Sequence, residues 1–224
     1  MTKPARETAA TLVIAVDGPA ASGKGTLAKR LAAWYHLAHL DTGLLYRGVA
    51  GMMLDAEHDL HDAALAEQAA SRFDPATLDE DRLRGRDMGE AASVIAAMPG
   101  VRAALVDLQR EFSRKGRGAV LDGRDIGTVI CPEATAKLFV TASPEVRAAR
   151  RHKELLARGE TVLLDDIVTD IRRRDARDSG RRDAPLKAAG DAVIVDTSAL
   201  TIDESLEAAI RIVERARLGA AKRH

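Results

Sequence analysis

The sequence predicts an α/β fold in which one parallel β-sheet is sandwiched between helices. Short apolar segments rich in β-branched residues alternate along the chain with longer segments of helical periodicity, as in strand–helix–strand units. The last of these apolar segments lies at 192–195 of the 224 residues, so the chain returns to the sheet near its end. A late core strand indicates one core with inserted segments rather than two domains in tandem.

Four strands are expected where short apolar runs end at a turn or at a polar residue. The first run is followed at once by Asp17-Gly18-Pro19 and the second by Asp122-Gly123, and both sequences stop a strand abruptly. The expected strands are 12–16, 119–121, 136–140 and 192–195.

Apolar residues at helical spacing predict the helices between these strands. On the first helix, Trp34 is expected to be a core residue. Ser143-Pro144-Glu145 predicts a helix start, because serine caps N-termini, proline suits the first position and glutamate suits the first turn. Residues 55–82 are expected to form short helices and loops, and Pro99-Gly100 to separate two helices. The other expected helices are 26–35, 44–54, 87–97, 101–114, 163–177 and 201–218.

Composition excludes several classes of function. The chain has 34 Lys and Arg against 34 Asp and Glu, so its net charge is zero, and aromatic residues make up 3%. Neither bulk basicity nor a stacking platform for nucleic acid is therefore expected. No apolar segment approaches the length of a membrane span, and residues 1–10 lack the apolar stretch of a signal peptide. We expect a cytoplasmic protein with no nucleic-acid or membrane partner.

Cysteine and histidine predict neither a disulfide nor a metal site. Cys131 is the single cysteine, which fits a reducing compartment, and we expect it to be a small buried residue. His36 and His39, and likewise His58 and His61, have the spacing of metal ligands, but no third ligand is evident for either pair. We therefore expect no metal ion held by the protein itself.

The most specific motif is a phosphate-binding loop between the first strand and the first helix, Gly18-Pro19-Ala20-Ala21-Ser22-Gly23-Lys24-Gly25-Thr26. It fits G-x-x-x-x-G-K in the context that this motif requires. Glycines let successive backbone N–H groups turn inward, the helix N-terminus adds its dipole, and Lys24 adds a mobile positive charge. The alternative, a glycine-rich turn with a surface lysine, is disfavoured by this context.

The residue after Lys24 indicates which class of phosphate-binding protein the loop resembles. Many nucleotide-hydrolysing proteins have Ser or Thr directly after the lysine, where its hydroxyl holds Mg²⁺. This chain has Gly25 there and its hydroxyl one position later, at Thr26. The Gly-Lys-Gly-Thr form resembles the loop of nucleoside monophosphate kinases, which implies a Mg²⁺ ion held mainly by the nucleotide phosphates and water.

Three further clusters are candidates for the acceptor side: 41–47, 121–128 and 172–183. The first places Arg47 one turn into a helix, where an arginine is more often solvated. The second follows a buried strand with alternating charges, which form either a ligand site or a salt-bridged turn. In the third, six of the eleven residues over 172–182 are arginine. These form a solvated helix face, a nucleic-acid patch or a mobile lid over phosphates. A lid suits phosphoryl transfer, which needs positioning and charge neutralisation.

With these segments, the chain resembles the bacterial cytidylate kinases from Val13 to about Arg217. The phosphate loop is shared with other monophosphate kinases, whereas the Gly-Arg-Asp turn and the AAS…VR segment point to cytidylate. The segments that carry the resemblance are GPAASGKGT, DTGLLYR, EAASVIAAMPGVRAAL, LDGRDIGTVICPEA, RRDARDSGRRDAPL and GDAVIVDTS.

The resemblance implies a role for each matched residue. The phosphate loop would hold the ATP phosphates, with Lys24 on the migrating group. Lid arginines Arg150 and Arg151 would reach the ATP side. The ribose hydroxyls would be held by Thr42 and Asp178, and the acceptor phosphate by Arg47, Arg124, Arg174 and Arg181. Catalysis would rest on Lys24, Arg124, Arg174 and Arg150.

The same resemblance assigns cytosine to Ser93, Arg102 and Asp125. The chemistry is consistent, because Asp125 can accept from the exocyclic amino group while Ser93 and Arg102 donate to O2 and N3. Uracil carries O4 and N3–H at the corresponding positions, so it would leave an acceptor unpaired. Sites built on such hydrogen bonds discriminate strongly.

The expected protein is a single P-loop kinase domain of the NTPase type, acting as a monomer on ATP with CMP or dCMP in the presence of Mg²⁺. Its core comprises 11–41, 118–149 and 183–218, its acceptor-binding insert about 42–117, and its short arginine-rich lid about 150–182. One departure from the family is a short stretch at 73–87, where a β-hairpin is missing.

Two rival functions remain open. One is a P-loop kinase with another small acceptor, such as UMP or shikimate. The other is a nucleotide-dependent switch that hydrolyses slowly and signals through a partner. Against the switch, the chain has no Ser or Thr directly after Lys24 and no Asn-Lys-x-Asp run to read guanine.

Overall fold

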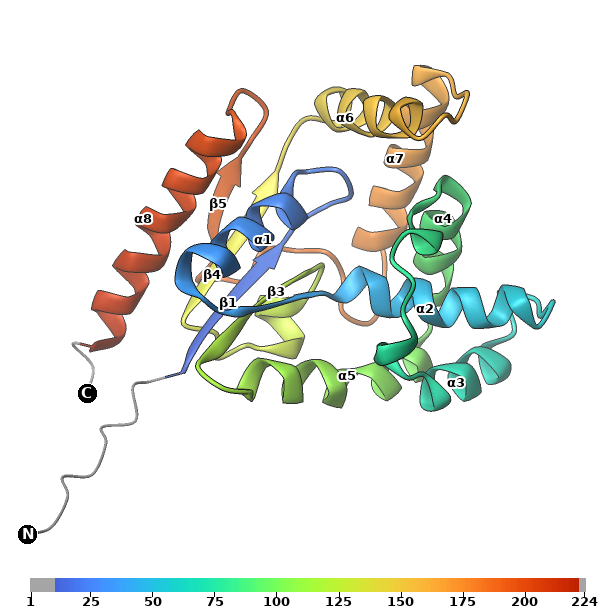
Figure 1. The fold of residues 1–224 in the computed structure, drawn as a ribbon, viewed down its shortest axis with the longest axis horizontal. Coiled ribbons are helices and arrows are strands. Elements are labelled where there is room, and N and C mark those ends of the chain that lie inside the picture. Colours follow the sequence, from blue (N-terminus) through green and yellow to red (C-terminus); the bar gives the residue numbers. More distant parts are fainter. Residues whose placement is uncertain (1–10, 222–224) are drawn as a thin grey trace, which may run out of the picture.

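The structure is a computed structural model that describes residues 11–221. Within this range five strands form one sheet in the order β2-β3-β1-β4-β5, and every neighbouring pair is parallel (Figure 1). The predicted fold class, a parallel sheet between helices, is therefore confirmed. The strands are β1 (Leu12–Asp17), β2 (Ala38–Asp41), β3 (Gly118–Gly123), β4 (Ala136–Thr141) and β5 (Val193–Asp196).

The helices agree with most of the predicted segments. Ser143 caps α6, and Thr201 and Glu204 form a reciprocal capping box at the start of α8. Pro99 is the first residue of α5 rather than part of a separate linker. The helices are α1 (Lys24–Tyr35), α2 (Thr42–Asp55), α3 (Ala63–Arg72), α4 (Arg86–Ile95), α5 (Pro99–Arg114), α6 (Pro144–Ala157), α7 (Leu164–Ser179) and α8 (Ile202–Ala221).

Strand β2 was not predicted from the sequence. Its four residues include a histidine and an aspartate, and none of the four is fully buried. A strand without an apolar run gives no sequence signal of its own. It forms because the chain after α1 pairs with β3 at the edge of the sheet, with Asp41 opposite Asp122.

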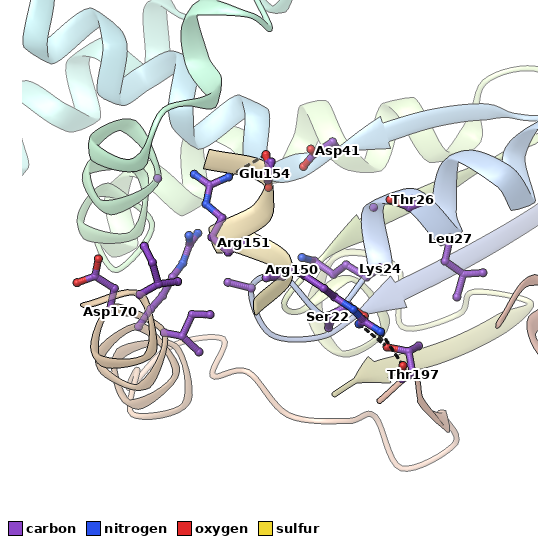
Figure 2. A pocket seen from close by; sticks show the side chains of 18 of the residues that line it. Ser22, Lys24, Thr26, Leu27, Asp41, Arg150, Arg151, Glu154, Asp170 and Thr197 are labelled. Carbon is purple, nitrogen blue, oxygen red and sulfur yellow. Dashed lines mark hydrogen bonds and ion pairs between the residues drawn. The ribbon is translucent and has the colours of Figure 1, made fainter. Parts of the chain in front are cut away.

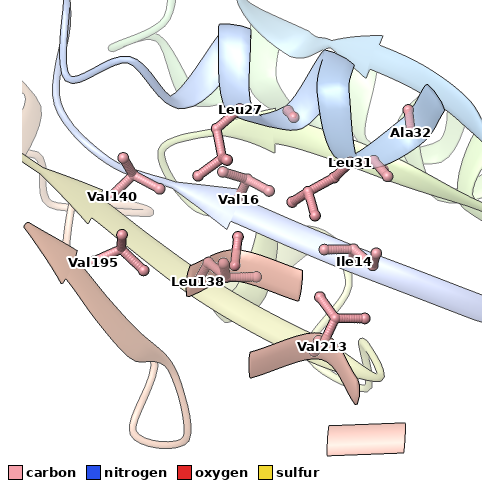
Figure 3. Close-up of a cluster of buried hydrophobic side chains, with 13 residues drawn as sticks. Ile14, Val16, Leu27, Leu31, Ala32, Leu138, Val140, Val195 and Val213 are labelled. Atoms are coloured by element: carbon pink, nitrogen blue, oxygen red, sulfur yellow. The ribbon is translucent and has the colours of Figure 1, made fainter. Parts of the chain in front are cut away.

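Side chains alternate between the two faces of the sheet, as strand geometry requires. On one face, Ile14 and Val16 pack beneath α1 and α8 with residues of β4 and β5 (Figure 3). On the other face, Ala15 packs with Ala119 and Leu121 against α5 and the π-helical turn η3 (Ile126–Ile130). Both faces of β1 are therefore covered, and the strand is fixed in the centre of the core.

Trp34 is not the core residue that the sequence predicts, because 60% of its surface is exposed. The buried stripe of α1 consists of Leu27, Ala28, Leu31 and Ala32, with Tyr35 packed at its edge. At about 100° per residue, Trp34 lies roughly a quarter turn from the centre of this stripe. Cys131, by contrast, is buried as predicted.

Two smaller apolar clusters lie beside the sheet. Helices α2, α3, α4 and α5 pack around Leu45, Met53 and Ile95, and α6 packs on α7 through Leu155 and Ile167. The stretch 73–87 contains two short 3₁₀ turns, η1 (Pro75–Thr77) and η2 (Arg82–Arg84), and no strand, so the expected absence of a hairpin is confirmed for these residues.

No single helix within 11–221 has both the length and the apolar character needed to cross a membrane. The consecutive helices α4 and α5 pass that test only together, and they are bent by 99°. Residues 1–10, where the sequence shows no signal peptide, lie outside the described range.

Candidate active site

The phosphate loop lies between β1 and α1, at the carboxyl edge of the central strand. Gly18 has φ of 154°, and a Cβ atom there would lie 2.0 Å from the Val140 carbonyl oxygen, so the turn requires glycine. Gly23, with φ of 86°, begins α1 without a side-chain cap. The first N–H groups of α1 are therefore not used by a capping side chain, which leaves them available to an anion.

The loop lines a cavity of about 690 Å³, hereafter the larger cavity (Figure 2). Residues Ala20–Thr26 form part of its wall, whereas Gly18 and Pro19, which were also predicted to bind the phosphates, are not among the residues that line it. Lys24 Nζ donates to the Pro19 carbonyl oxygen at 3.5 Å. Burial and then the positive charge of Arg124 lower the pKa of Lys24 to about 7. A phosphate bound in this cavity would reverse that shift by supplying negative charge.

Arg150 and Thr197 tie the loop to distant parts of the chain (Figure 2). The Arg150 guanidinium donates to the Thr197 hydroxyl at 2.9 Å and to its carbonyl oxygen at 2.7 Å. Thr197 in turn donates to the Ser22 carbonyl oxygen at 2.9 Å. Sequence reasoning missed Thr197. Its signal was its place directly after the last predicted strand, where parallel sheets present ligand contacts.

A second, smaller cavity of about 40 Å³ collects the residues predicted for the acceptor. Arg47 is the exception among the nine, because it lines the larger cavity instead. The eight predicted residues that line the smaller cavity are Thr42, Ser93, Arg102, Arg124, Asp125, Arg174, Asp178 and Arg181. Its size is far below the roughly 300 Å³ at which ligand pockets begin, so the cavity must widen to admit a nucleotide.

Asp178 is the centre of the charge network in the smaller cavity. Its carboxylate accepts from Arg124 Nε at 2.9 Å and from Arg181, and Arg174 Nε lies 3.9 Å away. Burial pushes the pKa of Asp178 upward, but the charges of Arg124, Arg181 and Arg174 outweigh it, so the pKa falls below its usual value. Asp178 is therefore ionised and holds these arginines together.

The predicted base-reading residues also contact one another. Arg102 donates to the Asp125 carboxylate, and both side chains are at least 93% buried. The Arg102 guanidinium lies over the Tyr46 ring, 5.6 Å from its centre. Ser93 Oγ donates to Asp178 Oδ1 at 3.4 Å. The residues assigned to the base and to the ribose thus form one connected wall.

Arg124 and Arg174 line both cavities. Burial and then the charge of Arg124 lower the pKa of Arg174 to about 9. Asp178 offsets part of the repulsion between these two guanidinium groups, and an anion bound beside them would offset more of it. The cavities therefore meet at a positively charged junction.

Ion pairs join α4 to α7, and three of the four residues in these pairs, Arg86, Glu90 and Asp170, line the larger cavity. Arg86 on α4 contacts Asp170 on α7 at 2.6 Å, and Arg177 on α7 contacts Glu90 on α4 at 2.5 Å. These partners were not predicted as site residues. The wide sequence separation between α4 and α7 gives no local signal for their pairing.

No group of three or more His, Cys, Asp or Glu side chains within the described range is placed to hold a metal ion. His39, one of the histidines with ligand-like spacing, instead shares a hydrogen bond of 2.7 Å with Asp122. Asp122 lies behind the phosphate loop, where its Oδ2 atom is 3.7 Å from the position of a Cβ built on Gly25.

Among solved structures, two similar chains share the fold. A gluconokinase from Sinorhizobium meliloti 1021 is 14% identical with a TM-score of 0.52, covering 95% of this chain and 98% of its own. An uncharacterised protein from Eubacterium ventriosum ATCC 27560 is 14% identical with a TM-score of 0.53, covering 92% and 99%. At this identity the likeness bears on the fold alone.

Sequence relatives are much closer. The family model described as cytidylate kinase matches residues 14–215. A cytidylate kinase of Xanthobacter autotrophicus is 62% identical over 208 residues, which are 93% of this chain and all of the relative. A cytidylate kinase of Caulobacter sp. strain K31 is 58% identical over 92% of this chain and 95% of its own. Because the match and the identity extend over nearly the whole chain, this chain belongs to the cytidylate kinase family.

Proposed function

We propose that this protein transfers the γ-phosphoryl group of ATP to CMP and dCMP, giving ADP together with CDP or dCDP. The observation that carries the proposal is the junction at Arg124 and Arg174. These two residues line both the larger cavity, which contains the phosphate loop, and the smaller cavity, which contains most of the predicted acceptor residues. A phosphoryl group passing between two nucleotides has to cross such a junction. Family membership supports the choice of cytidine nucleotides.

On the donor side, the loop N–H groups and Lys24 bind the ATP phosphates, and Arg150 lies beside the loop through Thr197. Mg²⁺ would be held mainly by the phosphates and water, since Gly25 provides no hydroxyl group after Lys24. When bound, Mg²⁺ supplies charge neutralisation for the phosphates.

On the acceptor side, Asp125 accepts from the amino group of cytosine, while Ser93 and Arg102 donate to its ring acceptors. Thr42 and Asp178 hold the ribose. The acceptor phosphate would lie at the junction, bound by Arg47, Arg124, Arg174 and Arg181. The buried pairing of Arg102 with Asp125 supports this arrangement, because it presents a donor and an acceptor side by side.

The acceptor phosphate oxygen attacks the γ-phosphorus in line, and Lys24 and the arginines neutralise the charge that spreads over the transferring group. In this scheme the core is 11–41, 118–149 and 183–218, the acceptor-binding insert is 42–117, and the lid is 150–182. The pairs between α4 and α7 join insert to lid. Their opening would admit substrates, and their closure would exclude water that otherwise hydrolyses ATP.

The test is release of ADP from ATP and Mg²⁺ with CMP, dCMP, UMP, AMP or no acceptor at equal concentration. Fast release with CMP and dCMP alone is expected. Equal use of UMP would retain the kinase but contradict base selection by Asp125. Preference for a different small acceptor would favour the rival kinase. Slow release that no acceptor accelerates would favour a nucleotide-dependent switch.

We further propose that the enzyme acts in the cytoplasm as a monomer, without a nucleic-acid or membrane partner. The phosphate-loop residues Ala20–Thr26 and eight of the nine predicted acceptor residues come together within one chain, which supports a site complete within one subunit. Light scattering after size exclusion tests the prediction, with a mass near 24.0 kDa as the expected result. A stable dimer mass would contradict it.

A further inference from the structure

The π-helical turn η3 begins directly after Asp125. The Asp125 carbonyl accepts from Ile130 N at 3.2 Å, and the Ile126 carbonyl accepts from Cys131 N at 2.7 Å, which is the i to i+5 pattern. Such turns are rare, poor in intrinsic stability and frequent at functional sites. The backbone direction of Arg124 and Asp125 therefore depends on what holds this turn.

Asp17 holds the N-terminal end of the turn. Its Oδ1 atom accepts from Ile126 N and its Oδ2 atom from Gly127 N, both at 2.7 Å. The side chain is buried, with the residue only 4% exposed. Both carboxylate oxygens are used, and each binds one of the first N–H groups of the turn, where a helix favours negative charge.

Arg110 on α5 holds the opposite end. It donates to the Val129 carbonyl at 3.1 Å and to the Ile130 carbonyl at 3.3 Å. A positive charge at this end complements the backbone carbonyls, as the carboxylate complements the N–H groups at the other. The turn is thus held at both ends by side chains from two other elements, β1 and α5.

Asp17 is not among the residues that line either cavity. We propose that Asp17 is a positioning residue for acceptor selection, because its carboxylate fixes the turn that directs Arg124 and Asp125 into the smaller cavity. This inference rests on the proposed function. It gives the aspartate before the phosphate loop a role on the acceptor side of the reaction.

The charged groups facing Asp17 are Asp125 and Arg124, and the aliphatic part of Lys137 packs on Gly127 beside it. Burial, partly offset by the hydrogen bonds from the Gly127 and Ile126 N–H groups, raises the pKa of Asp17 to about 6. Assays at pH 8 therefore keep Asp17 ionised in the unmodified protein, and they compare a charged carboxylate with its neutral replacement.

The main test is Asp17→Asn, which preserves size but replaces one acceptor oxygen by an NH₂ group facing a backbone N–H. We expect the KM for CMP to rise at least 10-fold and the ratio of kcat/KM for CMP over UMP to fall at least 10-fold. The KM for ATP should stay within about 3-fold, because the loop N–H groups that bind ATP are not bonded to Asp17.

Two further variants make the result decisive. Arg110→Met removes the support at the other end of the turn and should reproduce the same loss of CMP affinity and selectivity. Val213→Ala on α8 creates a cavity in the core cluster of Figure 3, far from the turn in sequence and packing. It lowers stability without touching η3, and its KM values and selectivity should remain those of the unmodified enzyme.

Each outcome bears on a distinct claim. Unchanged CMP affinity and selectivity in Asp17→Asn would overturn the inference, as would parallel losses for ATP and CMP. If Asp17→Asn does not fold, Arg110→Met decides, and unchanged selectivity there counts against the positioning role. If the unmodified enzyme does not phosphorylate CMP, it is the proposed function that fails.

Discussion

Arg102 and Asp125 form a buried ion pair in the wall of the smaller cavity. Arg102 is predicted to donate to a ring acceptor of the base and Asp125 to accept from its amino group. In this structure, where the cavity is too small for a nucleotide, they hydrogen-bond to each other instead. A base that enters must offer Asp125 a donor and Arg102 an acceptor at the same edge. Otherwise a buried charge loses part of its hydrogen bonding, which is costly.

Asp125→Asn therefore tests base selection. The amide keeps the shape but directs an NH₂ group toward the cytosine amino group, so the preference for CMP over UMP should fall by about 10²-fold or more. The measurement is kcat/KM for both acceptors. Asp107→Asn, an exposed change on the same helix as Arg102, is the matched control and should have no effect. An unchanged preference in Asp125→Asn would contradict the assignment.

Lys24→Met tests the donor side. The charge that neutralises the transferring group is removed while the loop backbone remains, so kcat should fall by about 10³-fold, in line with the loss of one transition-state contact. Binding of CMP, followed by calorimetry, should be nearly unchanged. The control is Lys115→Met, an exposed lysine at the end of α5. Turnover that survives Lys24→Met would rule out this mechanism.

The lowered pKa of Lys24 predicts proton uptake when ATP binds. Above pH 7 its amine is mostly neutral in the free enzyme, and the ATP phosphates raise its pKa, so the complex binds an extra proton. Affinity for ATP should consequently weaken as pH rises from about 7. Calorimetry at pH 8.5 in two buffers of different ionisation enthalpy measures the uptake. Lys24→Met should show none, and uptake equal to that of the unmodified enzyme would refute the linkage.

Gly18→Ala tests the geometry of the phosphate loop. The new Cβ would lie 2.0 Å from a backbone oxygen of β4, at a φ of 154°, so the loop has to move. Stability should fall by about 1–3 kcal/mol in urea unfolding, with a higher KM for ATP. Gly190→Ala has nothing within 4 Å of its Cβ and should change stability by less than about 0.5 kcal/mol. Equal stability of the two variants would show that the loop tolerates a side chain.

Local sequence predicted the fold where the local signal was strong. Apolar runs ending at Asp17 and Asp122 predicted the central strands, and the glycine pattern predicted the phosphate loop. β2 was missed because it forms by pairing with β3 rather than by its own composition. Trp34 was misplaced because helical spacing alone does not determine where the centre of the buried stripe lies.

The site was predicted less completely than the fold. Resemblance to a family supplied the acceptor residues, and the structure brings eight of the nine to one cavity. The resemblance could not supply the residues that hold the site residues in place through contacts with their backbone or their helices. Asp17 contacts the turn after Asp125 across 109 and 110 residues of chain, and Arg86 reaches Asp170 across 84. Contacts of that range depend on the folded arrangement, so they leave no spacing to recognise.

The hydrogen bond from Thr197 to the Ser22 carbonyl spans 175 residues. At 5–20 residues per second, the ribosome needs roughly 10–35 s to synthesise the chain between them. Throughout that interval the phosphate loop exists without its contact to Thr197, and Arg150, once synthesised, lacks its partner directly after the last strand. A nascent chain therefore completes this contact of its donor site only after Thr197 has been synthesised, so competence to bind ATP should arise much later than the phosphate loop itself.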